Sequence, residues 1–63
     1  MGLTPSQFIL NYRMNIACQL LTNRQLSIQS IAQQVGYANQ FNFSAAFKRV
    51  KSLGPYDWRK LYA

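Results

Sequence analysis

The 63-residue chain has a single acidic side chain and no histidine. Asp57 stands against seven lysines and arginines, so the formal net charge is +6 at pH 7. Without a second carboxylate, paired-acid catalysis is excluded, and without histidine neither zinc ligation nor cysteine–histidine catalysis is supported. No glycine-rich phosphate-binding loop occurs in the chain. The sequence therefore predicts a protein that is not an enzyme and that needs no metal or cofactor.

Cysteine and long apolar runs are equally scarce. Cys18 has no second cysteine to pair with, so we expect a reduced, small core residue and a cytoplasmic chain. No apolar run approaches the roughly 20 residues needed to span a bilayer. Residues 1–7 also lack the basic start and apolar stretch of a signal peptide. At this length we expect one small domain of marginal stability.

The positive charges are concentrated in the last part of the chain. So little acid is present to neutralise them locally that a polyanionic partner explains them better than a merely solvated basic surface. Five of the seven cations fall within the last sixteen residues, namely Lys48, Arg49, Lys51, Arg59 and Lys60.

The first predicted helix begins at Thr4–Pro5 and ends near residue 21 or 22. Threonine is a good N-cap, and proline is tolerated at the first helical position because its missing N–H would be unpaired there. Apolar residues then recur at steps of three and four and predict one wide buried stripe. Its members are Phe8, Ile9, Tyr12, Ile16, Ala17, Leu20 and Leu21.

Three shorter helices are predicted after a polar connection at residues 23–26. Ser27 caps the second helix and Gly36 ends it, Asn39 caps the third, and Gly54–Pro55 begins the fourth. The expected inward residues are Ile28, Ile31, Ala32 and Val35, then Phe43, Phe47 and Val50, then Trp58, Leu61 and Tyr62. No strand or hairpin signal interrupts them. The fold class is therefore predicted to be an all-α small helical bundle.

Residues 27–49 have the layout of a helix-turn-helix. Ala32 is small where two helices would cross closely, and Gly36 follows at the turn. Phe43 and Phe47 would anchor the next helix from beneath, so that its outward face fits a major groove about 12 Å wide. The spacing of Ala32 and Gly36 alone is weak evidence for a helix-turn-helix. The evidence is stronger because basic residues follow at the far end of the second helix of this unit.

The chain resembles the AraC/XylS family of transcription regulators over almost its whole length. One group of matching residues resembles the family's connecting helix, and a second resembles its second helix-turn-helix. The first group is Gly2-Leu3-Thr4-Pro5, Phe8-Ile9, Arg13, Ala17 and Leu20-Leu21. The second is Ser27-Ile28, Ile31-Ala32, Val35-Gly36-Tyr37, Phe43-Ser44, Phe47-Lys48-Arg49 and Pro55 with Trp58-Arg59.

The resemblance implies a homeodomain-like bundle with a connecting helix at residues 1–22 and a helix-turn-helix subdomain at 23–63. The family's DNA-binding domain has two helix-turn-helix units, and the resemblance implies that the 63 residues hold the second without the first and without an effector-binding or dimerisation domain. We favour an excised piece of a longer protein over an unusual natural half. Binding of double-stranded DNA by a recognition helix at about residues 39–51 is expected.

The expected base contacts are Gln40, Phe41, Ser44 and Ala45. Gln40 is the best candidate, because its amide can pair with two atoms of adenine, although a solvated surface glutamine is equally compatible with the sequence. Phe41 stands where relatives usually have a small or polar residue, and it either touches a thymine methyl group or tucks into the turn. Ala45 stands where many relatives have a longer, often basic side chain, which casts doubt on strong base specificity.

The expected contacts to the DNA backbone are Asn39, Asn42, Lys48, Arg49, Lys51 and Arg59. About three to five phosphate contacts predict a log–log salt slope of roughly −3 to −4.5. For Arg59, a bond to an internal carbonyl is at least as compatible, and Arg13 is expected to make a structural bond. Ser52 replaces a family glycine and is expected to strain a helix end, while Gly54 weakens a cap.

A rival interpretation makes the chain a protein-interaction module with only incidental DNA affinity. Such a module would touch RNA polymerase, or a second copy of the chain through the apolar stripe of the first helix. Membrane binding fits poorly, because the charged cluster and the longest apolar stripe are on different helices.

Overall fold

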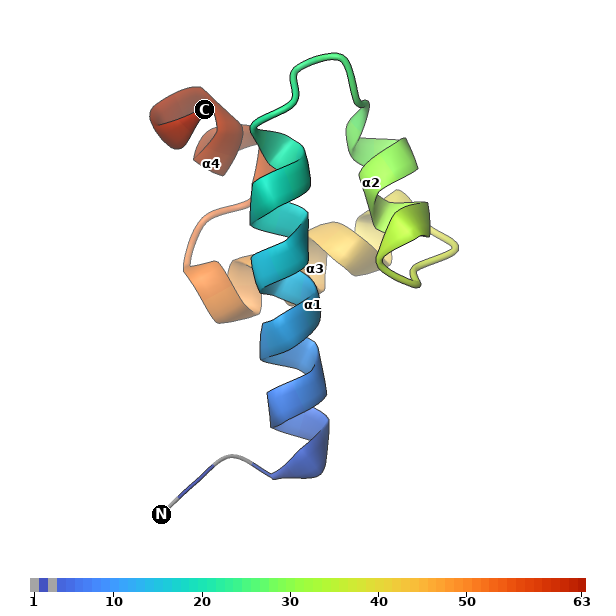
Figure 1. Cartoon of the computed structure of the whole chain (residues 1–63), viewed down its shortest axis with the longest axis vertical. Helices are drawn as coiled ribbons and strands as arrows, with labels where there is room; N and C mark the ends of the chain where they lie inside the picture. The colour runs from blue at the N-terminus through green and yellow to red at the C-terminus, as the bar shows by residue number, and fades with distance from the viewer. Residues whose placement is uncertain (1, 3) are drawn as a thin grey trace.

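The chain folds into four α-helices, with no strand in residues 2 and 4–63, which the computed structural model describes. They are α1 (Pro5–Leu21), α2 (Ile28–Gln34), α3 (Gln40–Lys51) and α4 (Pro55–Tyr62). α1 runs along the long axis of the molecule and α3 crosses it, with α2 and α4 toward opposite ends of α3 (Figure 1). The all-α bundle is confirmed. Met1 and Leu3, the latter part of the family resemblance, lie outside the described residues.

Side-chain caps begin the first three helices where the sequence predicts them. Thr4 accepts a hydrogen bond from the backbone N–H of Gln7, and the Gln7 side chain accepts one from the backbone N–H of Thr4 in return. Ser27 and Asn39 cap α2 and α3 in the same way through their side-chain oxygens. Each cap satisfies helix N–H groups that have no partner within the helix. α4 begins at Gly54, which provides no side-chain cap.

The tight turn between α2 and α3 depends on Gly36. Its φ is +96°, in the left-handed region that a side chain disfavours. The Tyr37 N–H then donates to the Ala32 carbonyl at 2.8 Å, which is the long-range bond of a Schellman helix end. The predicted end of α2 at Gly36 is therefore confirmed, and the chain turns directly into α3.

The core gathers under α3. Phe43 and Phe47 are fully buried, as predicted, and their rings continue an aromatic row from Tyr37 to Trp58. Successive ring centroids along this row are 5.7–6.3 Å apart, a favourable range for aromatic pairs. The other buried apolar residues are Met14, Ala17, Leu21, Ile28, Ile31, Ala32 and Val35.

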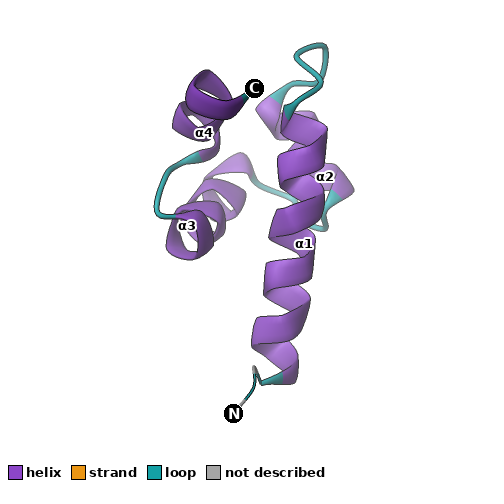
Figure 2. Cartoon of the chain, turned by 60° about the vertical axis from the view of Figure 1, so that its left-hand side comes forward, coloured by secondary structure: helices purple, strands orange, loops and turns teal. Residues whose placement is uncertain are grey.

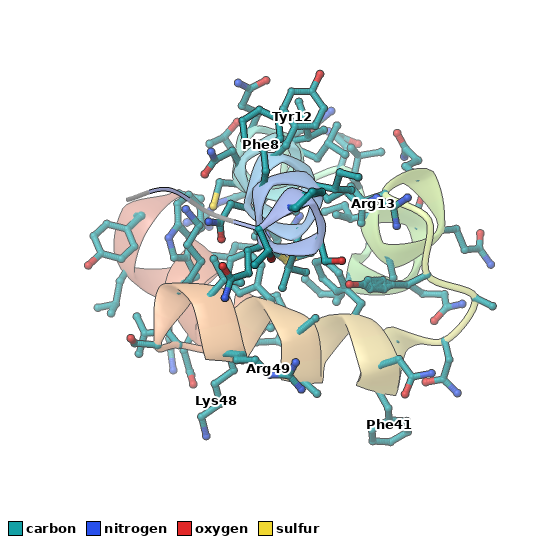
Figure 3. The ribbon with its side chains drawn as sticks, turned by 90° about the horizontal axis from the view of Figure 1, so that it is seen from below. Phe8, Tyr12, Arg13, Phe41, Lys48 and Arg49 are labelled. Carbon is teal, nitrogen blue, oxygen red and sulfur yellow. The ribbon has the colours of Figure 1, made fainter. Side chains whose placement is uncertain are left out.

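The prediction that α1 has a single wide buried stripe is wrong, because the helix has two apolar faces and only one of them is buried. Met14, which was not in the predicted stripe, is fully buried together with Ala17 and Leu21. Phe8 is 64% exposed and Tyr12 is 60% exposed, and both point away from α3 (Figure 3). The N-terminal half of α1 also extends beyond the other helices (Figures 1 and 2), so nothing in the described chain covers that face.

The packing predicted for α4 is only partly correct. Trp58 packs against the core, and Pro55 is buried although the sequence did not mark it as a core residue. Leu61 is 66% exposed, and Tyr62 is also exposed, although its ring lies 5.3 Å from that of Trp58. α4 therefore packs through its first turn, because no other element of the described chain covers this side of its last turn.

The C-terminal end of α3 carries the backbone strain that the sequence predicts. Ser52 has φ = +70°, whereas the left-handed conformation favours glycine. We expect Ser52→Gly to raise the free energy of unfolding by about 1 kcal/mol, and the melting temperature by about 4–8 °C. Ser52→Ala is the matched control, since it removes the hydroxyl and keeps the Cβ. Equal melting temperatures of the two variants in thermal denaturation would contradict the assignment of backbone strain to Ser52.

Candidate nucleic-acid interface

The outward face of α3 is exposed along its whole length. Phe43 and Phe47 point into the bundle, and residues on the opposite side of the same helix therefore point to solvent. Phe41 and Lys48 project from the side of α3 that faces away from α1 (Figure 3). Arg49 lies at the edge of this face, where it lines a hollow together with Gln7, Leu10 and Asn11 of α1. The exposed residues of the helix are Phe41, Asn42, Ala45, Lys48 and Arg49.

The four predicted base-contact residues do not share the centre of this face. Phe41 is 84% exposed, so the alternative in which it tucks into the turn is wrong. Ala45, one turn later, is also exposed. Gln40 and Ser44 are half-buried on the flank of the helix. The centre of the outward face could have been identified from the sequence. Phe43 and Phe47 define the inward direction of the helix, and the residues on the opposite side therefore form the centre of the outward face.

Gln40 lies where the start of α3 approaches α2. A shallow hollow there is lined by Gln29, Ala38, Asn39, Gln40 and Phe41. The flank of α3 that carries Gln40 therefore adjoins the exposed side of Gln29 on α2. This arrangement offers two amide side chains, each with donors and an acceptor, beside the first turn of the helix.

Cations occupy the last turn of α3. Lys48 and Arg49 are exposed and have no acidic residue in the same helix. Lys51 is half-buried, and its ammonium donates to the Asn15 side-chain oxygen on α1 at 2.8 Å. This acceptor is a neutral amide and not a carboxylate. The predicted backbone-contact cations of α3 therefore gather at one end of the exposed face.

The Asn39 side chain is already used within the protein. Its oxygen accepts hydrogen bonds from the N–H groups of Phe41 at 2.7 Å and Asn42 at 3.4 Å. The cap therefore occupies both of these backbone N–H groups. Asn42 itself is exposed on the edge of α3. Its amide side chain stays accessible for a ligand.

Arg59 binds internal carbonyls, the second of its two expected roles. Its guanidinium donates to the backbone carbonyls of Leu21 at 3.0 Å, Asn23 at 3.2 Å and Leu26 at 2.8 Å. The residue thereby ties α4 to the connection between α1 and α2. Most of its hydrogen-bonding capacity is used by these carbonyls, so Arg59 is not part of the candidate interface.

Arg13 makes a close approach that the sequence did not predict. A Cβ atom on Gly36 would lie 3.1 Å from a guanidinium nitrogen of Arg13. The exposed end of the Arg13 side chain can shift to make room for a Cβ atom, so the positive φ is what favours glycine at the turn. The expected structural hydrogen bond of Arg13 is absent from the contacts within residues 2 and 4–63, and the side chain is exposed.

Other site chemistries have little support in the described part of the chain. Within it, no group of three or more histidine, cysteine or acidic side chains is placed to hold a metal ion. Burial raises the pKa of the Cys18 thiol, an effect that the nearby charge of Lys51 partly opposes, so the thiol stays protonated at neutral pH. None of the four described helices combines the length and the apolar character needed to cross a membrane.

Comparison with known proteins agrees with this geometry. A family profile described as a helix-turn-helix domain matches residues 1–61, and AraC-like transcription regulators are among the relatives. The chain belongs to the AraC-type helix-turn-helix family. The resemblance identified in the sequence is thereby confirmed.

Several curated relatives align along most of the chain. The transcriptional regulator AlkR of Acinetobacter baylyi is 42% identical over 57 residues, which is 90% of this chain and 19% of AlkR. The MmsAB operon regulatory protein of Pseudomonas aeruginosa is 37% identical over 59 residues, 94% of this chain and 19% of that protein. An AraC-like transcription regulator of Streptomyces lividans is 36% identical, with the same coverage of 94% and 19%.

The chain spans about a fifth of the length of the curated relatives it matches. The similarity therefore concerns one segment of these relatives. No solved structure matches the chain significantly.

The carbonyl contacts of Arg59 can be tested by removing its side chain. Arg59→Ala leaves three backbone carbonyls without their charged donor, so we expect the free energy of unfolding to fall by about 2 kcal/mol. The control is Lys60→Ala, an exposed neighbour whose loss should change stability by less than about 0.5 kcal/mol. Urea denaturation of both variants measures the difference. A loss of DNA affinity without a loss of stability in Arg59→Ala would instead indicate a phosphate contact.

Proposed function

We propose that the chain binds double-stranded DNA in the regulation of transcription, with α3 lying in the major groove. The observation that carries the proposal is the exposed outward face of α3, held away from the bundle by the buried rings of Phe43 and Phe47. An α-helix is about 10–12 Å in diameter with its side chains, close to the groove width of about 12 Å. The net charge of +6 favours approach to the polyanion.

In this proposal the two ends of α3 have different roles. Gln40 and Ser44 lie near its start and read base edges by hydrogen bonding, while Phe41 and Ala45 lie against the floor of the groove. Gln40 is suited to adenine, which presents a donor and an acceptor side by side in the major groove. These contacts distinguish sequences and are therefore the source of specificity.

The cations at the other end contact phosphates. Lys48 and Arg49 are exposed, and Lys51 donates to the neutral side-chain amide of Asn15. Asn42 adds a polar contact from the edge of the helix, and Asn39 acts on the interface indirectly by capping α3. Such contacts orient the protein on the duplex and provide most of the salt-dependent affinity.

We further propose that residues 1–22 act as a connecting helix and residues 23–63 as a helix-turn-helix subdomain of a longer cytoplasmic regulator. The relatives are about five times as long as the segment they share with this chain, which supports the placement in a longer protein. Their names describe transcriptional regulators, and we extend that role to the protein that contains this chain.

A second candidate function rests on the exposed face of α1. Phe8, Ile9 and Tyr12 are large apolar side chains, each at least half exposed. Exposed apolar surface of this kind is typical of protein–protein contacts. RNA polymerase and a second copy of the chain are the candidate partners. In this alternative the chain would have only incidental affinity for DNA.

Titration with duplex DNA at two salt concentrations distinguishes these functions. We expect amide shifts in NMR spectra to concentrate at residues 40–51, and the affinity to fall with a log–log slope of about −3 to −4.5. An interaction module predicts shifts along residues 8–12 on addition of its partner and no steep salt dependence with DNA. Shifts spread evenly over all four helices would contradict the placement of α3.

Specificity and affinity should separate between the two ends of α3. The double variant Gln40→Ala, Ser44→Ala is expected to reduce the difference in affinity between a selected site and random DNA by about 1–3 kcal/mol. Lys48→Ala should weaken both duplexes alike and lower the salt slope by about 1. Lys60→Ala, on α4, is a control for the loss of one exposed charge. Equal effects of all these variants on both duplexes would contradict the assignment of base contacts.

A further inference from the structure

The centre of the outward face of α3 is apolar, although it lies between polar flanks. Phe41 and Ala45 are four residues apart and therefore stack on one side of the helix. Both are exposed, and Phe41, at 84%, is more exposed than any other large apolar side chain in the described residues. Gln40 and Ser44 lie on one flank of this pair, and Asn42 and Arg49 lie on the other.

Folding of the chain does not account for an aromatic ring at this position. Phe41 is absent from the set of side chains that pack on the core. The ring contacts between aromatic residues run from Tyr37 through Phe43 and Phe47 to Trp58 and Tyr62, and do not include it. A phenylalanine left in water forgoes the free energy that burial would provide. The ring is therefore available to a ligand that covers α3.

The chemistry of a benzyl side chain limits what it can recognise in a groove. Phe41 has no hydrogen-bond donor or acceptor, so it cannot read the polar pattern of base edges. The apolar group that natural bases present in the major groove is the C5 methyl of thymine. Ala45 adds a methyl group one turn further along the same side, which extends the apolar strip along the helix.

We infer that Phe41, supported by Ala45, makes the chain select DNA with methylated pyrimidines in the major groove. This inference rests on the proposed function and names the ligand feature that the centre of α3 recognises. Thymine and 5-methylcytosine carry the same methyl group at the same ring position, so both can pack against the apolar strip of Phe41 and Ala45. Uracil and unmodified cytosine lack it. The chain therefore reads the methyl group itself at this position, and C5 methylation of cytosine raises its affinity.

The expected gain in affinity follows from the apolar area that is removed from water when the methyl group packs against the ring. One methyl group buried against the ring corresponds to about a fourfold gain in affinity, and two to about tenfold or more. The flanking amides of Gln40 and Asn42 cannot produce this effect, because the hydrogen-bonding edges of the base pairs do not change with C5 methylation.

The experiment compares four duplexes that form two matched pairs. Alternating adenine–thymine DNA is compared with alternating adenine–uracil DNA, and alternating guanine–cytosine DNA with its 5-methylcytosine form. Fluorescence anisotropy at one fixed salt concentration measures the affinity of the whole 63-residue chain for each duplex. We expect the methylated member to bind about fourfold or more tightly in both pairs.

Two variants test whether the preference for methylated DNA comes from the ring of Phe41. Phe41→Ala should bring the ratio of affinities within each pair close to one. Phe8→Ala removes an exposed phenylalanine from the opposite side of the bundle and should leave the ratio unchanged. Because both side chains are exposed, thermal denaturation should show that both variants keep the fold.

The possible results separate the inference from the proposed function. Tight, salt-dependent binding with equal affinity within each pair would overturn the inference and leave DNA binding intact. A methyl preference that survives in Phe41→Ala would overturn the assignment to this ring, since groove shape would then be its source. The absence of salt-dependent binding to any duplex would refute the proposed function itself.

Discussion

The burial of Phe43 and Phe47 is the constraint on which the rest of the structure depends. These two rings, one turn apart, fix the rotation of α3 about its own axis, and so determine which residues face solvent. They also link the turn to α4, since Tyr37 packs on Phe43 at 5.9 Å and Trp58 on Phe47 at 6.3 Å. The exposed face of α3 is thus a consequence of its buried face. A change in the aromatic row would alter the direction of every outward side chain together.

So small a core leaves little margin, and polar contacts at its edge contribute to holding the elements in place. Arg59 ties α4 to the connection after α1 through three carbonyls, and the Asn39 cap sets the first turn of α3. Ser52 acts in the opposite direction, because its left-handed backbone stores strain at the end of that helix. The strain lies beside the cationic turn, whereas the cap lies beside Phe41. A side-chain cap therefore stabilises the start of α3, whereas a strained backbone destabilises its end.

Local signals in the sequence predicted the helix boundaries well. Caps and the Gly36 turn depend on a few adjacent residues, so Thr4, Ser27 and Asn39 act as their side-chain chemistry predicts. The face that α1 buries could not be predicted in this way. Apolar residues occur on both sides of that helix, and periodicity alone does not say which side meets α3. Arg59 was ambiguous for a similar reason, because its carbonyl acceptors come from a segment more than 30 residues earlier in the chain.

The two apolar faces of α1 have a consequence for how partners can assemble on the chain. Phe8 and Tyr12 lie on the side of the bundle opposite to Phe41 and Lys48 (Figure 3). A body that covers α1 therefore does not cover the outward face of α3, and the two proposed partner classes do not compete for the same surface. Arg13 is the α1 residue that comes near the turn before α3, because a Cβ atom on Gly36 would lie 3.1 Å from its guanidinium. Since Arg13 is next to Tyr12 in α1, a partner seated on α1 would reach the residue that borders this turn.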